Sequence, residues 1–409
     1  MDKKGTYILI GAAGGYVSGG PIYQRNKAIF MKRHGWDVYY ISCCHGKVYI
    51  EGLEDFIVGV FTFVAKPAYL FPKRYQRKLL ALLEKQLPFL SDNVVIETGT
   101  DYTAYWGELL AQKLRGKHIV TLLDEYNEHI DAKVAPFYRF KYNRGELACI
   151  SDEVMLHIFG NLIPQVQERQ YSLPCYCTNS LEESTPDWLE EIPTGDLTIG
   201  YIGRLEKNAV PVIMEGVRKY ACKNPDKQIV FLCIGGSDSE KYSLRIKEYF
   251  QEELNVAVYI TGLLFPIPLA CVQKCNLIFS TAGSCTVGAM AGVSTVRIHQ
   301  LTNEIQGVMK QVGSAESYKY DAAASVYDYI DLFCKGAICP KLAQYDLSQD
   351  WKRAEACFEK HLLMLKESSK DKTYFNFNHL RLSVTERLNK TVMNLFGMTI
   401  SNLICQCNQ

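Results

Sequence analysis

Apolar residues occur in two different patterns along the 409 residues of this chain. Short continuous apolar runs predict buried β-strands, and stretches with an apolar residue at every third or fourth position predict amphipathic helices. In the first half, the short runs predict strands at residues 7–10, 36–42, 56–63, 94–97, 119–123 and 147–150. Helices are expected between them, at residues 22–34, 76–86 and 105–114. Strands separated by helices of this length indicate a parallel sheet that is covered on both faces.

The same alternation starts again in the second half. The pattern predicts strands at residues 197–202, 229–234 and 256–261, and helices at residues 209–223, 240–254 and 267–274. Amphipathic helices are also expected near the C-terminus, at residues 351–365 and 385–395. Prolines and acidic residues gather between residues 171 and 195, which is typical of a connection between domains.

These patterns predict an α/β protein with two Rossmann-like, doubly wound domains that face each other across a cleft. We expect the first domain at residues 1–183, the second at residues 184–340 and a C-terminal helical segment at residues 341–409. In sheets of this kind, ligands bind at the carboxyl ends of the strands, so the loops at those ends are where site residues are expected.

Composition narrows the class of protein. Lys and Arg number 45 against 44 Asp and Glu, and the formal net charge of +1 is lower than nucleic-acid-binding proteins usually carry. The apolar run near the N-terminus is too short for a signal peptide, and no run is long enough to span a bilayer, so we expect a cytoplasmic protein. The 15 cysteines are scattered and form no paired C-x-x-C pattern, so we expect no metal site.

The segment at residues 276–298, NLIFSTAGSCTVGAMAGVSTVRI, contains the most informative loop. An apolar run ends there in small residues that open a short helix. A helix N-terminus presents free backbone N–H groups, which bind anions and most often phosphate. Gly283, Ser284, Cys285 and Thr286 are therefore candidate phosphate-binding residues. A plain turn between strand and helix, with small residues for close packing, remains the alternative.

Four segments resemble motifs of the large group-1 (family 4-like) glycosyltransferases of polysaccharide biosynthesis, which have the GT-B fold. They are GAAGGYVSGG with the following HGWDVYYIS, then ELACISDEVMLHIFG, TIGYIGRLEKN and FSTAGSCTVGAMAGV. The last is also similar to the nucleotide loop of the enzyme that adds N-acetylglucosamine to lipid-linked peptidoglycan precursors. The resemblance implies the GT-B fold, with C-terminal helices that cross back onto the first domain.

The same resemblance implies a function. A glycosyltransferase of this type moves a hexosyl group from a nucleotide sugar to a glycan or lipid-linked acceptor in surface polysaccharide assembly. The nucleotide sugar would be a substrate, and the hypothesis requires no cofactor and no metal. Two places depart from the family pattern. Gly288 stands where the family usually has a Glu that holds the donor ribose, and residues 281–284 stand where the family usually has another acidic residue. Different nucleotide contacts, a different donor and loss of activity are all compatible with these departures.

Sugar transfer from such a donor requires that the growing negative charge of the departing diphosphate be neutralised. Arg204 and Lys207 follow the strand predicted at residues 197–202, and Gly203, directly after that strand, is a candidate contact of the nucleotide. Charge-assisted hydrogen bonds to phosphate are strong and directional. These two cations are therefore the candidates for this task. The alternative for Arg204 is an exposed ion pair with Glu206.

Two further glycine loops are candidate contacts of the nucleotide. Gly14 and Gly15 would let the backbone approach the diphosphate closely, because glycine has no Cβ. Gly235, Gly236 and Ser237 follow another predicted strand and would lie near the base or the ribose. Ordinary turn chemistry is the alternative for both loops.

The first domain offers candidates for a base that activates the acceptor hydroxyl. Asp124 and Glu125 follow the strand predicted at residues 119–123, and His129 lies at helical spacing from Glu125. A carboxylate–imidazole pair of this kind can act as a general base. The alternative is an acidic pair that complements the dipole of a helix N-terminus.

The stretch between Lys66 and Lys85 is basic and aromatic and carries a leucine pattern. Such a helix can bind anionic lipid at the inner face of a membrane, and a core-facing helix is the alternative. Two further functions stay open at this point. One is a nucleotide-sugar epimerase of the same fold, and the other is a non-catalytic homologue that binds sugar nucleotides.

Overall fold

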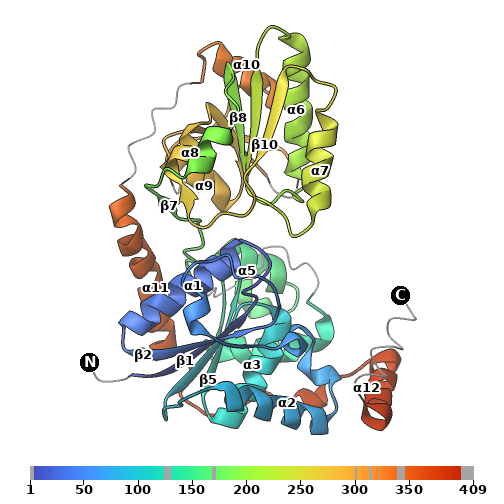
Figure 1. Cartoon of the computed structure of the whole chain (residues 1–409). Coiled ribbons are helices and arrows are strands. Elements are labelled where there is room, and N and C mark those ends of the chain that lie inside the picture. The colour runs from blue at the N-terminus through green and yellow to red at the C-terminus, as the bar shows by residue number, and fades with distance from the viewer. Residues whose placement is uncertain are drawn as a thin grey trace.

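The computed structural model describes residues 4–123, 130–167, 172–299, 302–312, 316–321, 323–338 and 346–397. Two α/β units follow each other along the chain, and Figure 1 shows them one above the other, with the second unit at the top. Each unit is built around its own mainly parallel sheet. No described helix is long and apolar enough to cross a membrane.

The first sheet has six strands in the order β3-β2-β1-β4-β5-β6, and every pairing is parallel. The order reverses between β1 and β4, which makes this the switch point of a doubly wound sheet. Its strands are β1 (Gly5–Gly11), β2 (Trp36–Ser42), β3 (Ile57–Val60), β4 (Val94–Thr98), β5 (Lys117–Leu122) and β6 (Leu147–Cys149).

Both faces of this sheet are covered, as the continuous apolar runs predict. Along β1, Tyr7 and Leu9 belong to one buried cluster, and Ile8 and Ile10 belong to another on the opposite face. Helices α1 (Gly19–Arg33) and α11 (Asp350–Glu367) cover the first face. The second face is covered by α2 (Lys73–Gln86), α3 (Asp101–Leu114), α4 (Ala135–Asn143) and α5 (Asp152–Phe159).

The second sheet has seven strands in the order β10-β9-β8-β12-β13-β14-β15. It is parallel up to β13, and the last two strands are antiparallel. Its strands are β8 (Leu197–Ile202), β9 (Ile229–Ile234), β10 (Val256–Ile260), β12 (Leu277–Thr281), β13 (Ser294–Ile298), β14 (Ile305–Met309) and β15 (Ser317–Tyr318). Its helices are α6 (Ala209–Lys223), α7 (Glu240–Tyr249), α8 (Leu269–Gln273), α9 (Gly283–Met290) and α10 (Val326–Cys334).

Several predicted elements differ from the structure. The helix predicted at residues 240–254 ends five residues earlier, since α7 is Glu240–Tyr249. The strand predicted at residues 56–63 is reduced to β3, because 3-10 turns at Glu54–Phe56 and Thr62–Ala65 occupy its ends. The helix predicted from residue 267 begins two residues later, since Ile267–Pro268 forms strand β11 beside β7 (Leu181–Glu182). Helix α1 begins inside the expected glycine loop, at Gly19.

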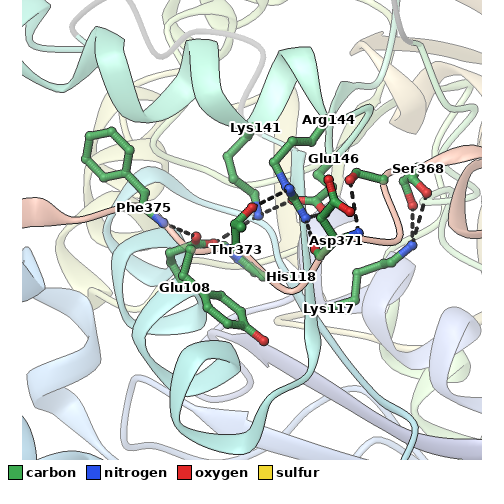
Figure 2. Close-up of polar contacts among 12 residues, drawn as sticks. Glu108, Lys117, His118, Lys141, Arg144, Glu146, Ser368, Asp371, Thr373 and Phe375 are labelled. Carbon is green, nitrogen blue, oxygen red and sulfur yellow. Dashed lines mark hydrogen bonds and ion pairs between the residues drawn. The ribbon is translucent and has the colours of Figure 1, made fainter.

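The chain returns from the second unit to the first through α11, whose ribbon runs down the side of the molecule in Figure 1. The end of α11 and the segment after it are anchored by hydrogen bonds from charged side chains, which Figure 2 shows in close-up. Lys117 donates to the Ser368 hydroxyl at 2.7 Å and to the carbonyl oxygen of Leu365 at 3.0 Å. Arg144 donates to the Thr373 hydroxyl at 2.8 Å. A final helix, α12 (Val384–Phe396), then lies against the first unit.

The centre of this anchor is a buried charge network, which we call the Glu108 network (Figure 2). One Glu108 oxygen lies 2.9 Å from His118 Nδ1 and 2.9 Å from Lys141 Nζ, and the other accepts the Phe375 N–H at 2.8 Å. Burial alone would raise the pKa of this carboxyl, but the Lys141 ammonium and these hydrogen bonds hold it at about 2. Lys141 also pairs with Glu146 at 2.7 Å.

A second buried network, the Glu97 network, ties α11 to the opposite face of the sheet. The hydroxyls of Tyr7 and Tyr23 donate to Glu97, and Lys27 Nζ lies 3.6 Å from the same carboxylate. His361 of α11 places its Nδ1 3.3 Å from the Tyr23 hydroxyl. Burial, together with the nearby Lys27 charge, lowers the pKa of His361 to about 3.

Candidate functional site

A cavity of about 480 Å³ lies between the two units. Its wall combines the residues that follow β1 and β4 in the first sheet with those that follow β8, β9 and β12 in the second. Both sheets reverse their strand order there, between β1 and β4 and between β8 and β12. Because ligands of doubly wound sheets bind at such switch points, this cavity is the candidate site.

The second unit contributes a floor of closely packed backbone. Gly203 follows β8 and has φ +146°, and Gly235 follows β9 and has φ +148°. A Cβ placed on Gly235 would lie 2.0 Å from the carbonyl oxygen of Gly203 and 2.9 Å from its carbonyl carbon. Both positions therefore require glycine, and a ligand can approach the main chain there without meeting side chains.

The N-terminus of α9 forms the adjoining wall through Ala282, Gly283 and Ser284. Ala282 is the N-cap residue and has φ 50° and ψ −137°, a conformation that costs free energy in a residue with a Cβ. Such strain persists only where the surrounding structure imposes it, and it gathers at ligand sites. The first turn of α9 is thus aimed at the cavity, and its backbone N–H groups favour an anion there.

Both predicted cations line this cavity. Lys207 Nζ donates to the Thr281 hydroxyl at 2.8 Å, which holds the ammonium beside the end of β12. The exposed ion pair considered for Arg204 is present, since its Nη1 lies 3.3 Å from Glu206. An ion pair with this exposure contributes little stability, so an anionic ligand can compete for the guanidinium.

The first unit contributes polar groups that the sequence patterns did not single out. Tyr16 and Thr100 line the cavity, as does Asn179 of the connecting segment. Thr100 caps α3, because its hydroxyl accepts the Thr103 N–H at 3.4 Å. Burial, with the neighbouring Cys44, raises the pKa of Tyr16 to about 12, so its hydroxyl stays protonated near neutrality.

Other candidates lie away from the cavity wall. The N–H of Gly15 is hydrogen-bonded to the carbonyl oxygen of Lys47, and Gly14 is packed against the main chain of residues 45–46. Ser237 accepts the Ser239 N–H at 3.3 Å within its own loop, whereas its neighbours Gly235 and Gly236 line the cavity.

Of the four candidate phosphate-binding residues of α9, two line the cavity and two do not. Cys285 is fully buried and Thr286 follows it in α9, and neither lines the cavity, whereas Gly283 and Ser284 do. Burial raises the pKa of the Cys285 thiol to about 11, so this side chain is a core group.

The structure shows where Gly288 lies, which bears on the absence of the Glu that the family usually has at this position. This glycine lies inside α9, and a Cβ there would meet the Thr295 hydroxyl at 2.4 Å and Ile278 at 3.1 Å. The space beside residue 288 therefore belongs to the core between α9 and the sheet. A carboxylate at this position would not point into the cavity, so its absence removes no group from the site.

The three candidate bases, Asp124, Glu125 and His129, lie outside the described residues. Leu123, the last described residue before them, lines the cavity. Among the described residues, no group of three or more His, Cys, Asp or Glu side chains is arranged to hold a metal ion.

Neither a family model nor a curated protein sequence matches the chain. Solved structures do match. A glycosyltransferase from Rickettsia africae ESF-5 is similar at 14% identity, with 88% of this chain and 96% of that chain covered and a TM-score of 0.54. Anabaena HepE, solved in complex with UDP and glucose, is similar at 11% identity over 95% and 99% of the two chains, with a TM-score of 0.51. A UDP-N-acetylglucosamine 2-epimerase from Rickettsia bellii reaches a TM-score of 0.45 at 11% identity over 88% and 96%.

These similarities, together with the two facing sheets, show that the chain has the fold of GT-B glycosyltransferases. The expected fold class is thereby confirmed.

Proposed function

We propose that this protein is a glycosyltransferase that moves a hexosyl group from a nucleotide sugar to a glycan or lipid-linked acceptor in surface polysaccharide biosynthesis. The observation that carries the proposal is the meeting of two cations, a strained helix N-terminus and bare glycine backbone at one cavity wall. HepE, which has this fold, binds UDP and glucose.

The proposed chemistry centres on the departing diphosphate. As the bond to the sugar breaks, negative charge grows on the phosphate oxygens, and stabilising that charge lowers the barrier. Arg204 and Lys207 would supply positive charge, and the first turn of α9 would add N–H donors at Gly283 and Ser284. Gly203, Gly235 and Gly236 would admit the rest of the nucleotide to the backbone.

The first domain would hold the acceptor on the opposite wall. Asp124, Glu125 and His129 are our candidates for the base, since they follow Leu123 in the sequence and Leu123 lines the cavity. Burying the reacting groups between two domains excludes water, which would otherwise hydrolyse the donor. The two cations perform the task that a metal ion performs elsewhere, so the proposal includes neither metal nor cofactor.

Product analysis tests the proposal. The purified protein is incubated with UDP-, GDP-, ADP- and CMP-sugars, with and without glycan or lipid-linked acceptors, and the released nucleotide and the modified acceptor are measured. Arg204→Ala should lower turnover at least about tenfold without lowering the melting temperature. Arg218→Ala is the matched control, because Arg218 of α6 is equally exposed, pairs with Glu253 and does not line the cavity.

Two outcomes would contradict the proposal. A donor whose sugar is epimerised without any acceptor would identify an epimerase of this fold. Binding of a sugar nucleotide with no turnover on any acceptor would identify a non-catalytic homologue. An Arg204→Ala variant with full turnover would remove Arg204 from its assigned role.

A further inference from the structure

Helix α12 presents its apolar side to solvent. Val384, Leu388 and Leu395 are 77%, 60% and 68% exposed, and their spacing of four and seven residues places them on one stripe. Phe396, beside the end of this stripe, is 61% exposed. We call these four residues the α12 stripe. A helix that only supported the fold would turn this side inward.

The polar side of α12 makes the contacts with the first domain. Glu386 pairs with Lys133 at 2.5 Å, and Lys390 Nζ donates to the carbonyl oxygen of Tyr69 at 2.9 Å. Met393 adds an apolar contact to the core. Because the opposite side of α12 contacts the first domain, the α12 stripe faces away from the described residues of that domain.

Helix α2 borders α12 and supplies positive charge. Arg74 donates to the carbonyl oxygen of Asn394, which joins the start of α2 to the end of α12, and Figure 1 shows both helices at the end of the first domain away from the second. The exposed basic residues of α2 are Lys73, Arg74, Arg77, Lys78 and Lys85. Its one acidic residue, Glu84, pairs with Lys113 at 2.9 Å.

This arrangement revises the expected membrane helix between Lys66 and Lys85. Residues 68–70 form a 3-10 turn rather than part of the helix. The leucines Leu80 and Leu83 are buried in the core, as are Tyr69 and Phe71. Leu82 is the exposed leucine of α2, at 42%, so this helix contributes mainly charge and one exposed leucine.

We infer that the α12 stripe inserts into the surface of an anionic lipid bilayer while the basic residues of α2 contact lipid phosphates. Charge decides between the possible occupants. A second copy docked through the same surface would bring one basic helix against another, which is unfavourable, whereas an anionic bilayer complements the charge and accepts the apolar stripe. Inserted stripes of this kind lie in the plane of the membrane without crossing it.

Vesicle binding tests this inference independently of sugar transfer, because it requires no turnover. The full-length chain is sedimented with phosphatidylcholine vesicles that contain or lack phosphatidylglycerol. We expect binding to the anionic vesicles that weakens as salt increases. The double variant Leu388→Ser/Leu395→Ser should bind them about tenfold or more weakly, since two leucines no longer leave water.

The matched control is Leu244→Ser/Leu254→Ser, at two leucines of the second domain that are 54% and 98% exposed. This control should bind as the wild type does. The double variant Arg77→Gln/Lys78→Gln tests the contribution of positive charge and keeps the contact made by Arg74. It should bind anionic vesicles several-fold more weakly than the wild type. Its control is Lys241→Gln/Arg245→Gln in the second domain.

Three results would overturn the inference. One is equal binding by the wild type and the Leu388→Ser/Leu395→Ser variant. Another is a wild-type dimer in sedimentation velocity that this variant abolishes, which would identify a second copy as the occupant. The third is a loss of melting temperature in the variant as large as that of a core substitution, which would show that the chain itself covers the stripe.

Discussion

The two domains use charged side chains in opposite ways. In the first domain, the Glu97 and Glu108 networks are buried, and their partners reach across more than 200 residues of sequence to α11 and the segment that follows it. In the second domain, Arg204 and Lys207 stand at the wall of a cavity, and each has a contact that a ligand can replace or share. The buried charges hold the chain together, whereas the cavity charges remain available for a ligand.

This contrast warns against equating a displaced pKa with catalysis. Burial and Lys141 lower the pKa of His118 to about 4, and that of Glu108 is about 2, yet these side chains lie in the Glu108 network away from the cavity. Structural ion networks displace pKa values as strongly as active sites do. In this molecule, the backbone geometry of Gly203, Gly235 and Ala282 points to the candidate site, whereas the displaced pKa values of His118 and Glu108 do not.

Removing Glu108 should have the largest effect on stability. Glu108→Ala would leave Lys141 buried with one of its partners gone, which typically costs about 3–5 kcal/mol of unfolding free energy. Urea denaturation measures this loss. The exposed Glu359 of α11 is the control, and Glu359→Ala should change stability by less than about 0.5 kcal/mol. Equal effects would show that the network is not structural.

Acid should destabilise the protein through the same networks. Folded pKa values of about 4 for His118 and about 3 for His361 lie below the ordinary 6.5, so the unfolded chain binds protons first as the pH falls. Stability is therefore full above pH 6.5 and falls as the pH drops toward these folded values, by an amount on the order of 3 kcal/mol for His118. Glu108 adds a loss between pH 4.5 and about 2, since its folded pKa is also depressed.

Melting curves between pH 7 and pH 4 test this prediction. His361→Gln should flatten the pH dependence, whereas His157→Gln, at an exposed position of α5, should leave it unchanged. A wild-type melting temperature that stays constant down to pH 4 would contradict the account.

Gly235→Ala should damage the cavity floor. The new methyl group would collide with the Gly203 carbonyl at 2.0 Å, so we expect a loss of about 2 kcal/mol or more together with weaker nucleotide binding. Gly336→Ala is the control, because Gly336 has φ +70° but open space around its Cβ. The control should show only the cost of positive φ, about 1 kcal/mol, and unchanged binding. If Gly235→Ala bound nucleotide as the wild type does, the backbone of Gly203 and Gly235 would not be part of the binding site.

The smallest expected effect belongs to Ser284. Loss of one neutral hydroxyl should weaken nucleotide binding about two- to tenfold, because the backbone N–H groups of α9 remain. Isothermal titration of Ser284→Ala measures this change, with Thr286→Ala as the control at a position that does not line the cavity. A larger loss in the control would contradict the placement of these two residues.

The sequence predicted the alternation of strands and helices well, because buried parallel strands such as β1, β8 and β12 are continuous apolar runs. It also placed Arg204, Lys207, Gly235 and Ser284 at strand ends that the structure brings to one cavity. Local pattern does not say which way a loop folds, so Gly14 and Gly15 were expected at a wall from which they are turned away.

Long-range contacts were beyond any local pattern. The Glu97 network includes His361, which contacts the Tyr23 hydroxyl, and Glu108 accepts the Phe375 N–H. Both residues belong to a segment that returns only after the second domain. The core position of Gly288 likewise depends on Thr295 of the neighbouring strand. The outward stripe of α12 follows from how its polar side docks, and an amphipathic pattern alone does not specify that side.

The most direct test of the central claim is the affinity of the folded protein for nucleoside diphosphates, measured by isothermal titration with UDP, GDP, ADP and CDP. We predict that one of them binds the wild type, and that Arg204→Ala/Lys207→Ala weakens this binding about 100-fold or more while the melting temperature stays the same. A wild type that binds none of them, or a double variant that binds as tightly as the wild type, would contradict this prediction.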